Sequence, residues 1–321
     1  MLLSIVVPVY NEEESLEILL KEIFAVAKEK QYDIEVIFVD DGSTDSSWSV
    51  VEKLGAADNR VRGIRFRRNF GKAAGLQAGF SEAKGEIILS MDADLQDDPK
   101  EIPNFLEKLD MGYDCVSGWK KVRHDPWHKV YPSRVFNWMV SRLTGVVLHD
   151  HNCGMKAYRR EIFDEIVLYG EMHRFVPVLA GSRGFKVGEI VIQHRAREFG
   201  HSKYGVSRIF KGFMDLMTVK FVTSYGQRPL HLLGNFGMGL FSLGALGIFV
   251  MAALWVLTRC WSDAAAILGG PFSVSAHPAL ALFSVVFILL GAQFLCAGLL
   301  AELITSFHQK PGKNYSVKKK I

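Results

Sequence analysis

Cysteine is scarce in this chain of 321 residues, and two common phosphate-binding motifs are absent. The four cysteines are scattered and form no CxxC pair, so the sequence indicates neither a zinc site nor a disulfide framework. No GxxxxGKS or GxxxxGKT segment occurs, which excludes a P-loop protein, and no GxGxxG follows the first apolar segment. If the chain binds phosphate, other groups must hold it.

Charge is missing from two long stretches in the C-terminal third. No charged residue occurs between Leu232 and Leu257 or between Pro278 and Ala301. Each run exceeds the roughly 20 apolar residues that a helix needs to cross a bilayer. The two runs therefore predict a transmembrane helical hairpin, and a pair of buried core helices is the alternative.

Acidic residues are also rare beside these two runs, where basic residues gather. Only Asp215 opposes the basic residues before the first run, and residues 308–321 contain no acid. By the positive-inside rule, both termini and the N-terminal domain of this multi-pass protein are expected on the cytoplasmic side of the inner membrane. Met1–Pro8 lacks the basic segment of a signal peptide and is expected to be a strand. The basic residues are Lys203, Arg208, Lys211, Lys220 and Arg228 before the first run, and Lys310, Lys313, Lys318, Lys319 and Lys320 after the second.

Strand-like and helix-like segments alternate from the N-terminus to about residue 120. This alternation predicts a right-handed α/β fold with a mostly parallel sheet. Asn11 is expected to cap the first helix, with Glu12, Glu13 and Glu14 in its first turn. The predicted strands are Ser4–Val9, Glu35–Val39, Val61–Phe66 and Glu86–Met91.

Acidic side chains follow three of the predicted strands, in the segments Tyr10–Glu12, Asp40–Asp41 and Asp92–Asp94. Ligands of parallel sheets bind beyond the carboxyl ends of the strands, so these segments predict one common site. Asp92 and Asp94 form a DxD pair, and two carboxylates at this spacing suit Mg²⁺ or Mn²⁺ bound together with substrate phosphates.

The stretch SMDADLQDDP, Ser90–Pro99, contains four aspartates within seven residues. Carboxylates this close repel one another, and burying them unpaired is costly. We expect a divalent cation, shared with a pyrophosphate, to offset the repulsion between these carboxylates. Asp97 and Asp98 are expected to cap a helix near Pro99 rather than to bind the metal.

Four motifs occur in order: VPVYNEEE (Val7–Glu14), VDDGSTDSS (Val39–Ser47), NFGKAAGLQAGFSEAKGE (Asn69–Glu86) and DADLQDDP (Asp92–Pro99). Together they resemble the family 2 glycosyltransferases, whose domain has the GT-A (Rossmann-like) fold. The chain is most similar to the polyprenyl-phosphate glycosyltransferases, which include dolichol-phosphate mannose synthases and bactoprenol glucosyltransferases. The resemblance covers roughly residues 3 to 210, and the two apolar runs match the bactoprenol-type members better.

The resemblance implies roles for individual residues at a nucleotide-sugar site. Asp41 is expected to accept a hydrogen bond from the base, and Asp94 and Gln96 are expected to bind the metal. Asp150, in the loosely matching segment HDHNCGMKAYRRE, is the acid expected near the sugar, and it joins Asp92 and Asp94 in the catalytic set. The residues expected to contact the nucleotide sugar are Pro8, Tyr10, Glu12, Val39, Asp41, Asp92, Ala93, Arg197 and Lys203.

The same resemblance implies that Lys120, Arg123 and Arg134 bind a lipid phosphate. Lys120 stands where the family more often has an arginine, which can bind phosphate through two parallel hydrogen bonds. A solvated basic face is the alternative for the segment from Lys120 to Arg134. A phosphate monoester, with a second pKa of about 6, is already largely ionised near pH 7. Such an acceptor needs cations around it rather than a general base.

These features predict a membrane-anchored, inverting glycosyltransferase that moves a hexose from a nucleotide sugar to undecaprenyl or dolichyl phosphate. By resemblance the expected donor is UDP-glucose, and GDP-mannose or a UDP-aminosugar is the alternative. A non-catalytic membrane scaffold that keeps the nucleotide-binding fold is a second alternative. Mg²⁺ or Mn²⁺ is the expected cofactor. A homo-oligomer such as a tetramer is the expected assembly, and no nucleic-acid partner is expected.

Four segments are expected along the chain: a GT-A catalytic domain (1–204), an amphipathic juxtamembrane helix with a linker (205–230), the transmembrane hairpin (231–307) and a basic cytoplasmic tail (308–321). The apolar face of the amphipathic helix contains Phe213, Met214 and Met217. This face is expected to lie in the lipid headgroup layer, and packing against the globular domain is the alternative.

Overall fold

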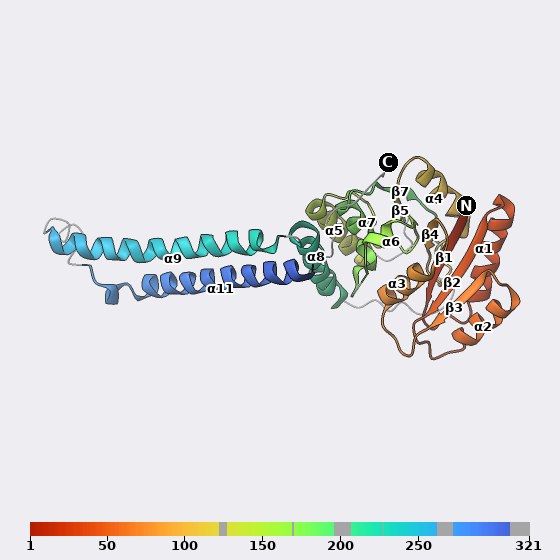
Figure 1. The fold of residues 1–321 in the computed structure, drawn as a ribbon, viewed down its shortest axis with the longest axis horizontal. Helices are drawn as coiled ribbons and strands as arrows, with labels where there is room; N and C mark the ends of the chain where they lie inside the picture. Colours follow the sequence, from red (N-terminus) through yellow and green to blue (C-terminus); the bar gives the residue numbers. More distant parts are fainter. Residues whose placement is uncertain (122–126, 169, 196–206, 227, 262–271, 309–321) are drawn as a thin grey trace. The chain divides into compact units, whose positions relative to one another are not determined.

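The computed structural model describes residues 1–121, 127–168, 170–195, 207–226, 228–261 and 272–308. It divides into two compact units, of which one runs from Met1 to Lys220 and the other begins at Phe221 (Figure 1). The predicted boundary between residues 204 and 205 lies outside the described residues.

The first unit is built on one sheet, with the strands β1 (Leu2–Val9), β2 (Asp33–Asp40), β3 (Val61–Arg65), β4 (Ile87–Ser90), β5 (Cys115–Trp119), β6 (Lys156–Arg159) and β7 (Val187–Val191). The strand order is β3-β2-β1-β4-β6-β5-β7 (Figure 1). The pairs β1–β2, β2–β3, β1–β4 and β5–β7 are parallel, whereas β6 runs antiparallel to both of its neighbours. The predicted α/β fold with a mostly parallel sheet is therefore confirmed.

The helices of the first unit are α1 (Leu16–Lys30), α2 (Ser47–Ala57), α3 (Lys72–Glu82), α4 (Ile102–Asp110), α5 (Trp127–Thr144), α6 (Ile162–Glu165), α7 (Val176–Ser182) and α8 (Ser207–Tyr225), which continues into the second unit. Two short 3₁₀ helices, η1 (Pro99–Glu101) and η2 (Met172–Phe175), complete the set within the described residues.

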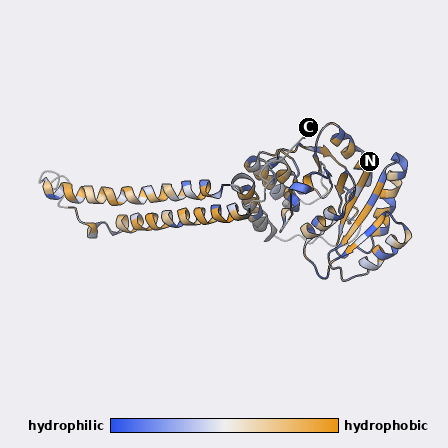
Figure 2. Ribbon diagram, viewed as in Figure 1, coloured by the Kyte–Doolittle hydropathy of each residue, from blue (hydrophilic) through white to orange (hydrophobic). Residues whose placement is uncertain are grey.

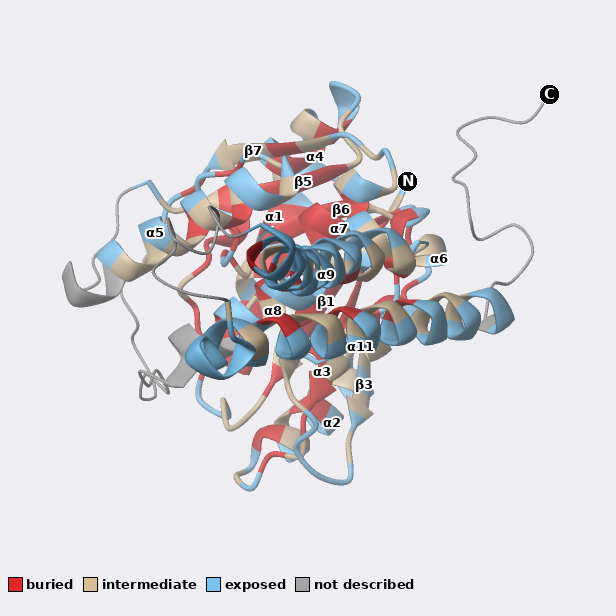
Figure 3. Ribbon diagram, turned by 90° about the vertical axis from the view of Figure 1, so that its left-hand side faces the viewer, coloured by how far each residue is buried: buried red, intermediate tan, exposed pale blue. Residues whose placement is uncertain are grey.

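The sheet is covered on both faces, because successive side chains of a strand point to opposite sides. Leu3, Ile5 and Val7 of β1 belong to a core that also contains side chains of α1 and α4. Val6 belongs to a second core with side chains of α3 and α7. Figure 3 shows many of the buried residues in the strands of the sheet.

The start of the first helix differs from the prediction. α1 begins at Leu16, and Asn11 adopts a left-handed backbone conformation with a φ of 55°. The Asn11 side chain accepts a hydrogen bond from the Thr44 N–H at 2.9 Å, and the Glu12 N–H donates to Ser47 Oγ at 2.9 Å. These bonds tie the loop after β1 to the loop after β2, which keeps Asn11 and Glu12 out of the helix.

Glycine allows α3 to pack directly on the sheet. A Cβ on Gly79 would lie 2.3 Å from Val6 Cγ1 and 3.3 Å from Val39 Cγ2, which no side chain larger than hydrogen can accept without displacement. This close approach fixes the axis of α3 against β1 and β2. It also determines where Lys72, the first residue of α3, lies relative to the ends of these strands.

The predicted amphipathic helix, α8, is apolar on two sides. Leu216 and Val219 are fully buried in the core of the first unit, so the helix packs on the globular domain, as the alternative stated. Phe213, Met214 and Met217 remain exposed within the described part of the chain. Contact of this exposed face with lipid headgroups stays a prediction.

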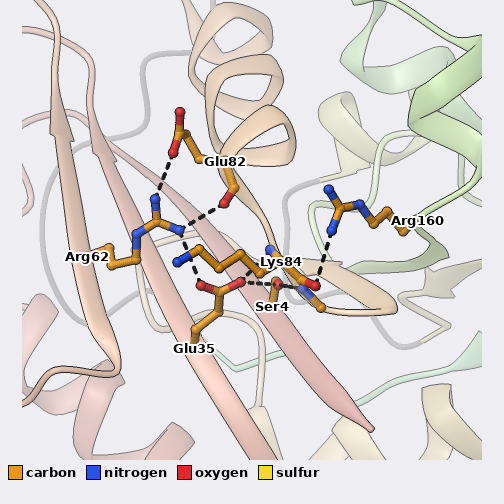
Figure 4. Close-up of polar contacts among 7 residues, drawn as sticks. Ser4, Glu35, Arg62, Glu82, Lys84 and Arg160 are labelled. Carbon is orange, nitrogen blue, oxygen red and sulfur yellow. Dashed lines mark hydrogen bonds and ion pairs between the residues drawn. The ribbon is translucent and has the colours of Figure 1, made fainter.

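A polar network joins the beginnings of β1, β2 and β3 at the edge of the sheet where these strands start (Figure 4). Glu35 is buried, and its Oε1 accepts hydrogen bonds from Ser4 Oγ and from the Lys84 N–H, both at 2.6 Å. Arg62 Nη1 donates to Glu35 Oε2 at 3.3 Å, and Nη2 donates to Glu82 Oε2 at 2.7 Å. Burial raises the pKa of Glu35, but these donors outweigh burial and hold the pKa below its ordinary value of 4.5.

Replacing Glu35 with glutamine is expected to lower the free energy of unfolding by about 1 to 3 kcal/mol at pH 7, because buried donors lose a charged acceptor. The folded pKa of Glu35 lies below its unfolded pKa, so its stabilisation is complete above about pH 4.5 and is lost as the pH falls. The difference between the two proteins should therefore shrink in acid. Urea unfolding at several pH values measures this, with the exposed Glu107→Gln as the control. A difference that grows as the pH falls would contradict the assigned network.

The second unit contains α9 (Pro229–Cys260), the 3₁₀ helix η3 (Val274–Ala276) and α11 (Pro278–His308). Both long helices are apolar along their length and long enough to cross a membrane (Figure 2). Only 11% of the most apolar window of each is buried, and most of their surface is exposed (Figure 3). Core helices of a soluble protein would be mostly buried, so the structure favours two membrane spans over that alternative.

Small residues line the contact between α9 and α11. A Cβ on Gly291 would lie 2.7 Å from the Gly237 carbonyl oxygen and 2.6 Å from the Phe241 nitrogen. A Cβ on Gly244 would lie 2.5 Å from the Ser284 carbonyl oxygen. The two backbones therefore approach closely, as in other membrane helix pairs that have small residues at the contact.

Glu302 of α11 caps the beginning of α9. Its Oε2 accepts a hydrogen bond from the Leu230 N–H at 3.2 Å. The first N–H groups of a helix have no partner within the helix, and the positive end of the helix dipole favours a carboxylate there. The hairpin is thus held by a polar contact as well as by close backbone packing.

Candidate functional site

The carboxyl ends of β1, β2 and β4 meet at one edge of the sheet. Val9 pairs with Asp40, and Ser90 pairs with both Val6 and Lys156. Because β6 is antiparallel to β4 and β5, the end of β5 and the beginning of β6 reach the same edge. The structure therefore brings the three acidic segments together with Lys120, which follows β5.

The residues predicted to line the nucleotide begin at the ends of β1 and β2. Pro8 and Val39 are partners in the β1–β2 register, with Val39 fully buried and Pro8 half-buried. Tyr10 and Glu12 follow β1 and are also half-buried. These four residues lie on adjacent strands and in the loop that follows, so they are neighbours, as expected.

Asp41 is buried, and both of its carboxylate oxygens already accept backbone hydrogen bonds. The Phe70 N–H donates to Oδ1 at 2.6 Å and the Gly71 N–H donates to Oδ2 at 2.9 Å. Burial raises the pKa of Asp41 above its ordinary value, and the neighbouring Asp40 adds to this, although the two N–H groups oppose it. Each carboxylate oxygen has a second lone pair, which can accept a further hydrogen bond.

Asp92 is held by two residues that the sequence prediction did not include, Lys72 and Gly154. The Lys72 ammonium forms an ion pair and hydrogen bond with Asp92 Oδ1. Burial alone would raise the pKa of Asp92, but the Lys72 charge outweighs it and holds that pKa at about 2. On the other side, a Cβ on Gly154 would lie 2.4 Å from Asp92 Oδ2. The Asp92 carboxylate is thus fixed between the Lys72 ammonium and Gly154, which has no side chain.

Protein cations also offset two of the other aspartates. Lys120 Nζ lies 3.0 Å from Asp97 Oδ1, and Arg195 Nη2 lies 2.8 Å from Asp98 Oδ1. Burial lowers the pKa of Lys120, but Asp97 outweighs burial and raises it well above its ordinary value. The expectation that a divalent cation makes all four acids tolerable is therefore wrong for Asp92, Asp97 and Asp98.

The role predicted for Asp98 as a cap is confirmed. It is the N-cap of η1, and its Oδ1 accepts a hydrogen bond from the Lys100 N–H at 3.0 Å. Asp97 instead faces Lys120 and pairs through its backbone with His194. Arg195 bonds to both oxygens of Glu22 at 2.9 and 2.8 Å, which joins α1 to the segment that follows β7.

Asp94 and Gln96 lie on a tight turn, in which Leu95 has a left-handed φ of 61°. Asp94 is almost fully buried, like Ala93 before it, and its Oδ1 accepts a hydrogen bond from the Gln96 N–H at 3.2 Å. Within the described residues, no group of three or more His, Cys, Asp or Glu side chains is arranged to hold a metal ion. One carboxylate and one amide fit Mg²⁺ or Mn²⁺ that takes its remaining ligands from substrate phosphates and water.

Asp150 is buried in the loop before β6, where its Oδ1 accepts the Asn152 N–H at 3.0 Å. Two buried basic side chains share this region. Burial lowers the pKa of Lys156, and burial together with the Lys156 charge lowers the pKa of His151 to about 4. Lys156 and His151 were not predicted, and the segment HDHNCGMKAYRRE, which contains both, was their only signal in the sequence.

The residues predicted to bind the lipid phosphate differ in exposure where the structure describes them. Arg134 lies on α5 and is exposed, whereas Lys120 is mostly buried in its ion pair with Asp97. Arg123, Arg197 and Lys203 lie outside the described residues.

The family model described as Glycosyl transferase family 2 matches residues 4–167 of this chain. A dodecaprenyl-phosphate galacturonate synthase from Rhizobium johnstonii is 38% identical over 98% of this chain and 92% of its own length. An undecaprenyl-phosphate 4-deoxy-4-formamido-L-arabinose transferase from Pseudomonas fluorescens is 38% identical over 94% of this chain and 84% of its own length.

Solved structures with the same fold include glucosyl-3-phosphoglycerate synthase from Mycobacterium tuberculosis, crystallised with Mn²⁺, uridine diphosphate and phosphoglyceric acid. The TM-score is 0.54 at 17% identity, and the match covers 69% of this chain and 78% of that one. At this identity the likeness concerns the fold alone.

Proposed function

Because the chain belongs to glycosyl transferase family 2, we propose that it transfers a sugar from a nucleotide sugar to a polyprenyl phosphate. The observation that carries this proposal is the presence, in one chain, of an acidic site at the strand ends and an apolar helical hairpin. The similarity to the Rhizobium johnstonii synthase extends over 98% of this chain, so it includes the hairpin. A polyprenyl tail keeps its phosphate at the bilayer surface, where a membrane-anchored site can reach it.

On the donor side, Asp94 and Gln96 would hold Mg²⁺ or Mn²⁺ together with the diphosphate. Such an ion, when bound, supplies Lewis-acid stabilisation of the leaving diphosphate. Asp92, fixed by Lys72, would contact the sugar donor, and Asp41 would contact the base. The other proposed donor residues are Pro8, Tyr10, Glu12, Val39, Ala93, Arg197 and Lys203.

On the acceptor side, the phosphate would attack the anomeric carbon directly, which inverts its configuration. A phosphate monoester is mostly ionised at neutral pH, so it needs positive charge around it rather than proton removal. Arg134 is exposed and is the proposed first contact of the lipid phosphate, and Arg123 and Lys120 are the other proposed contacts. Asp150 would face the sugar, where its buried carboxylate can accept a hydroxyl hydrogen bond.

The sugar is proposed from the resemblance and from the names of the relatives. The resemblance to the bactoprenol glucosyltransferases favours UDP-glucose, whereas the names of the relatives given above specify galacturonate and 4-deoxy-4-formamido-L-arabinose. The proposal is therefore a UDP-linked sugar, with a uronate and a formamido-pentose as rivals of glucose. GDP-mannose is the alternative with a different base.

The deciding experiment is transfer from a panel of radiolabelled donors to undecaprenyl phosphate by the full-length protein in vesicles. UDP-glucose, UDP-galacturonate, UDP-4-deoxy-4-formamido-L-arabinose and GDP-mannose form the panel. One donor is expected to yield labelled lipid, and chelation of divalent cations is expected to stop the transfer. Nucleotide binding without any labelled lipid from the panel would favour the non-catalytic scaffold instead.

The role of Arg134 is tested in the same assay with Arg134→Ala. The KM for the lipid phosphate is expected to rise about tenfold, with little change in the KM for the donor, because one charge-assisted contact to the acceptor is lost. Arg142→Ala, an exposed arginine on the same helix, is the control. Unchanged acceptor kinetics in Arg134→Ala would contradict the assigned contact.

The proposed arrangement in the cell follows from the charge pattern. The catalytic domain (1–204), the juxtamembrane segment (205–230) and the basic tail (308–321) would lie on the cytoplasmic side, with residues 231–307 crossing the inner membrane twice. The protein would assemble as a homo-oligomer.

A further inference from the structure

Lys72 lies among the carboxylates of the site without belonging to the acidic stretch itself. It is the first residue of α3, and the position of α3 is fixed by the contact of Gly79 with Val6. Its ammonium pairs with Asp92, and its side chain remains 35% exposed. Lys72 is therefore both anchored to an acid of the site and accessible from solvent.

Three carboxylates act on this ammonium. Asp92 is the strongest, and Asp97 and Asp94 add to it, so the Lys72 pKa is raised although burial opposes this. Asp97 has a second cation in Lys120. The two lysines thus offset much of the negative charge of Asp92, Asp94 and Asp97 before any substrate arrives.

On the basis of the function proposed above, we propose that Lys72 is a positioning residue that fixes Asp92 and makes metal binding depend on the nucleotide. With its ammonium in place, the site attracts a divalent cation only weakly when the diphosphate is absent. The diphosphate brings the missing negative charge, so the cation and the nucleotide bind together. The physical reason is that like charges a few ångströms apart repel strongly in a site with a low effective dielectric constant.

The test uses the full-length protein in detergent with two variants that remove the charge, Lys72→Met and Lys72→Gln, and with Lys72→Arg, which keeps it. Lys53→Met is the matched control, because Lys53 also makes an ion pair from a helix, with Glu17, at a distance from the site. Mn²⁺ affinity is measured by electron paramagnetic resonance, first without nucleotide and then with UDP.

Without UDP, Lys72→Met and Lys72→Gln are expected to bind Mn²⁺ about tenfold more tightly than the wild-type protein. Lys72→Arg and Lys53→Met should match the wild type. Addition of UDP should increase Mn²⁺ affinity less in the two neutral variants than in the wild type. A residue that only stabilised the fold would weaken metal binding when removed, so the direction of the change separates the two roles.

Turnover provides a second readout. At saturating donor and Mn²⁺, kcat is expected to fall about a hundredfold in Lys72→Met, because Asp92 loses the partner that orients it. Lys72→Arg should recover most of this loss.

Equal or weaker Mn²⁺ binding in both neutral variants would overturn the inference, as would failure of Lys72→Arg to recover turnover. A wild-type protein that neither binds Mn²⁺ with UDP nor transfers sugar would instead contradict the proposed function, so the two failures are distinguishable.

Discussion

Sugar transfer is expected to fall by about a thousandfold or more when Asp94 is replaced by alanine. Asp94 is nearly fully buried on the turn that precedes Gln96, and it is the only carboxylate proposed to bind the metal directly. Its removal takes away the one carboxylate assigned to the metal and leaves the amide of Gln96 as the remaining proposed ligand from the chain. Initial rates of lipid labelling at saturating Mn²⁺ measure the loss.

Asp110→Ala is the matched control, because Asp110 is an exposed aspartate at the end of α4. Both variants should partition into membranes like the wild type, since neither change affects the hairpin. If Asp94→Ala transfers sugar at more than about a tenth of the wild-type rate, the proposed role of Asp94 in metal binding is contradicted.

The second large effect is expected at Gly154, which touches no substrate in the proposed mechanism. In Gly154→Ala the new methyl group would lie 2.4 Å from Asp92 Oδ2 and 2.6 Å from Cγ, so the carboxylate must move away from its present position. A displacement of about 1 Å at a reacting site can reduce the rate about a hundredfold. We expect a loss of that size in kcat/KM for the donor, measured by lipid labelling.

Gly55→Ala is the control for Gly154→Ala, because a Cβ on Gly55 would meet only the Val61 carbonyl oxygen, at 3.4 Å. Thermal unfolding should show that both variants remain folded. A normal kcat/KM in folded Gly154→Ala would mean that the orientation of Asp92 does not matter for transfer.

The strands and the edge at which they end could be predicted from local patterns. β1, β2 and β4 contain short apolar runs, and an acid occurs within three residues after the end of each strand. A parallel sheet then requires the acids to meet at one edge, so the general location of the site follows without knowledge of any long-range contact.

The partners of the acids could not be predicted in this way. Lys72 and Asp92 are 20 residues apart on different elements, and their contact depends on how closely α3 packs against β1 and β2. Lys120 was assigned to the lipid phosphate because motif comparison gives no information about its contact with Asp97. The expectation that a shared divalent cation balances the acids did not include these lysine partners for the same reason.

The structure differs from the sequence-based prediction at two further places, and each difference has an identifiable cause. Asn11 is a good helix cap by residue type, but its side chain bonds to Thr44 in a neighbouring loop, which moves the helix start to Leu16. β6 is antiparallel within an otherwise parallel sheet, and this reversal brings Lys156 and the Asp150 loop to the site edge. Sequence alternation alone predicts parallel order and gives no sign of such a reversal.

The contact between Glu302 and Leu230 has a consequence for biosynthesis. The carboxylate that caps α9 lies 72 residues after the Leu230 N–H, which donates the hydrogen bond to it. A ribosome must therefore synthesise Glu302, which lies in the last third of α11, before the Leu230 N–H can acquire this acceptor. The N-terminal cap of α9 therefore forms only when α11 is also present, which couples completion of the two helices.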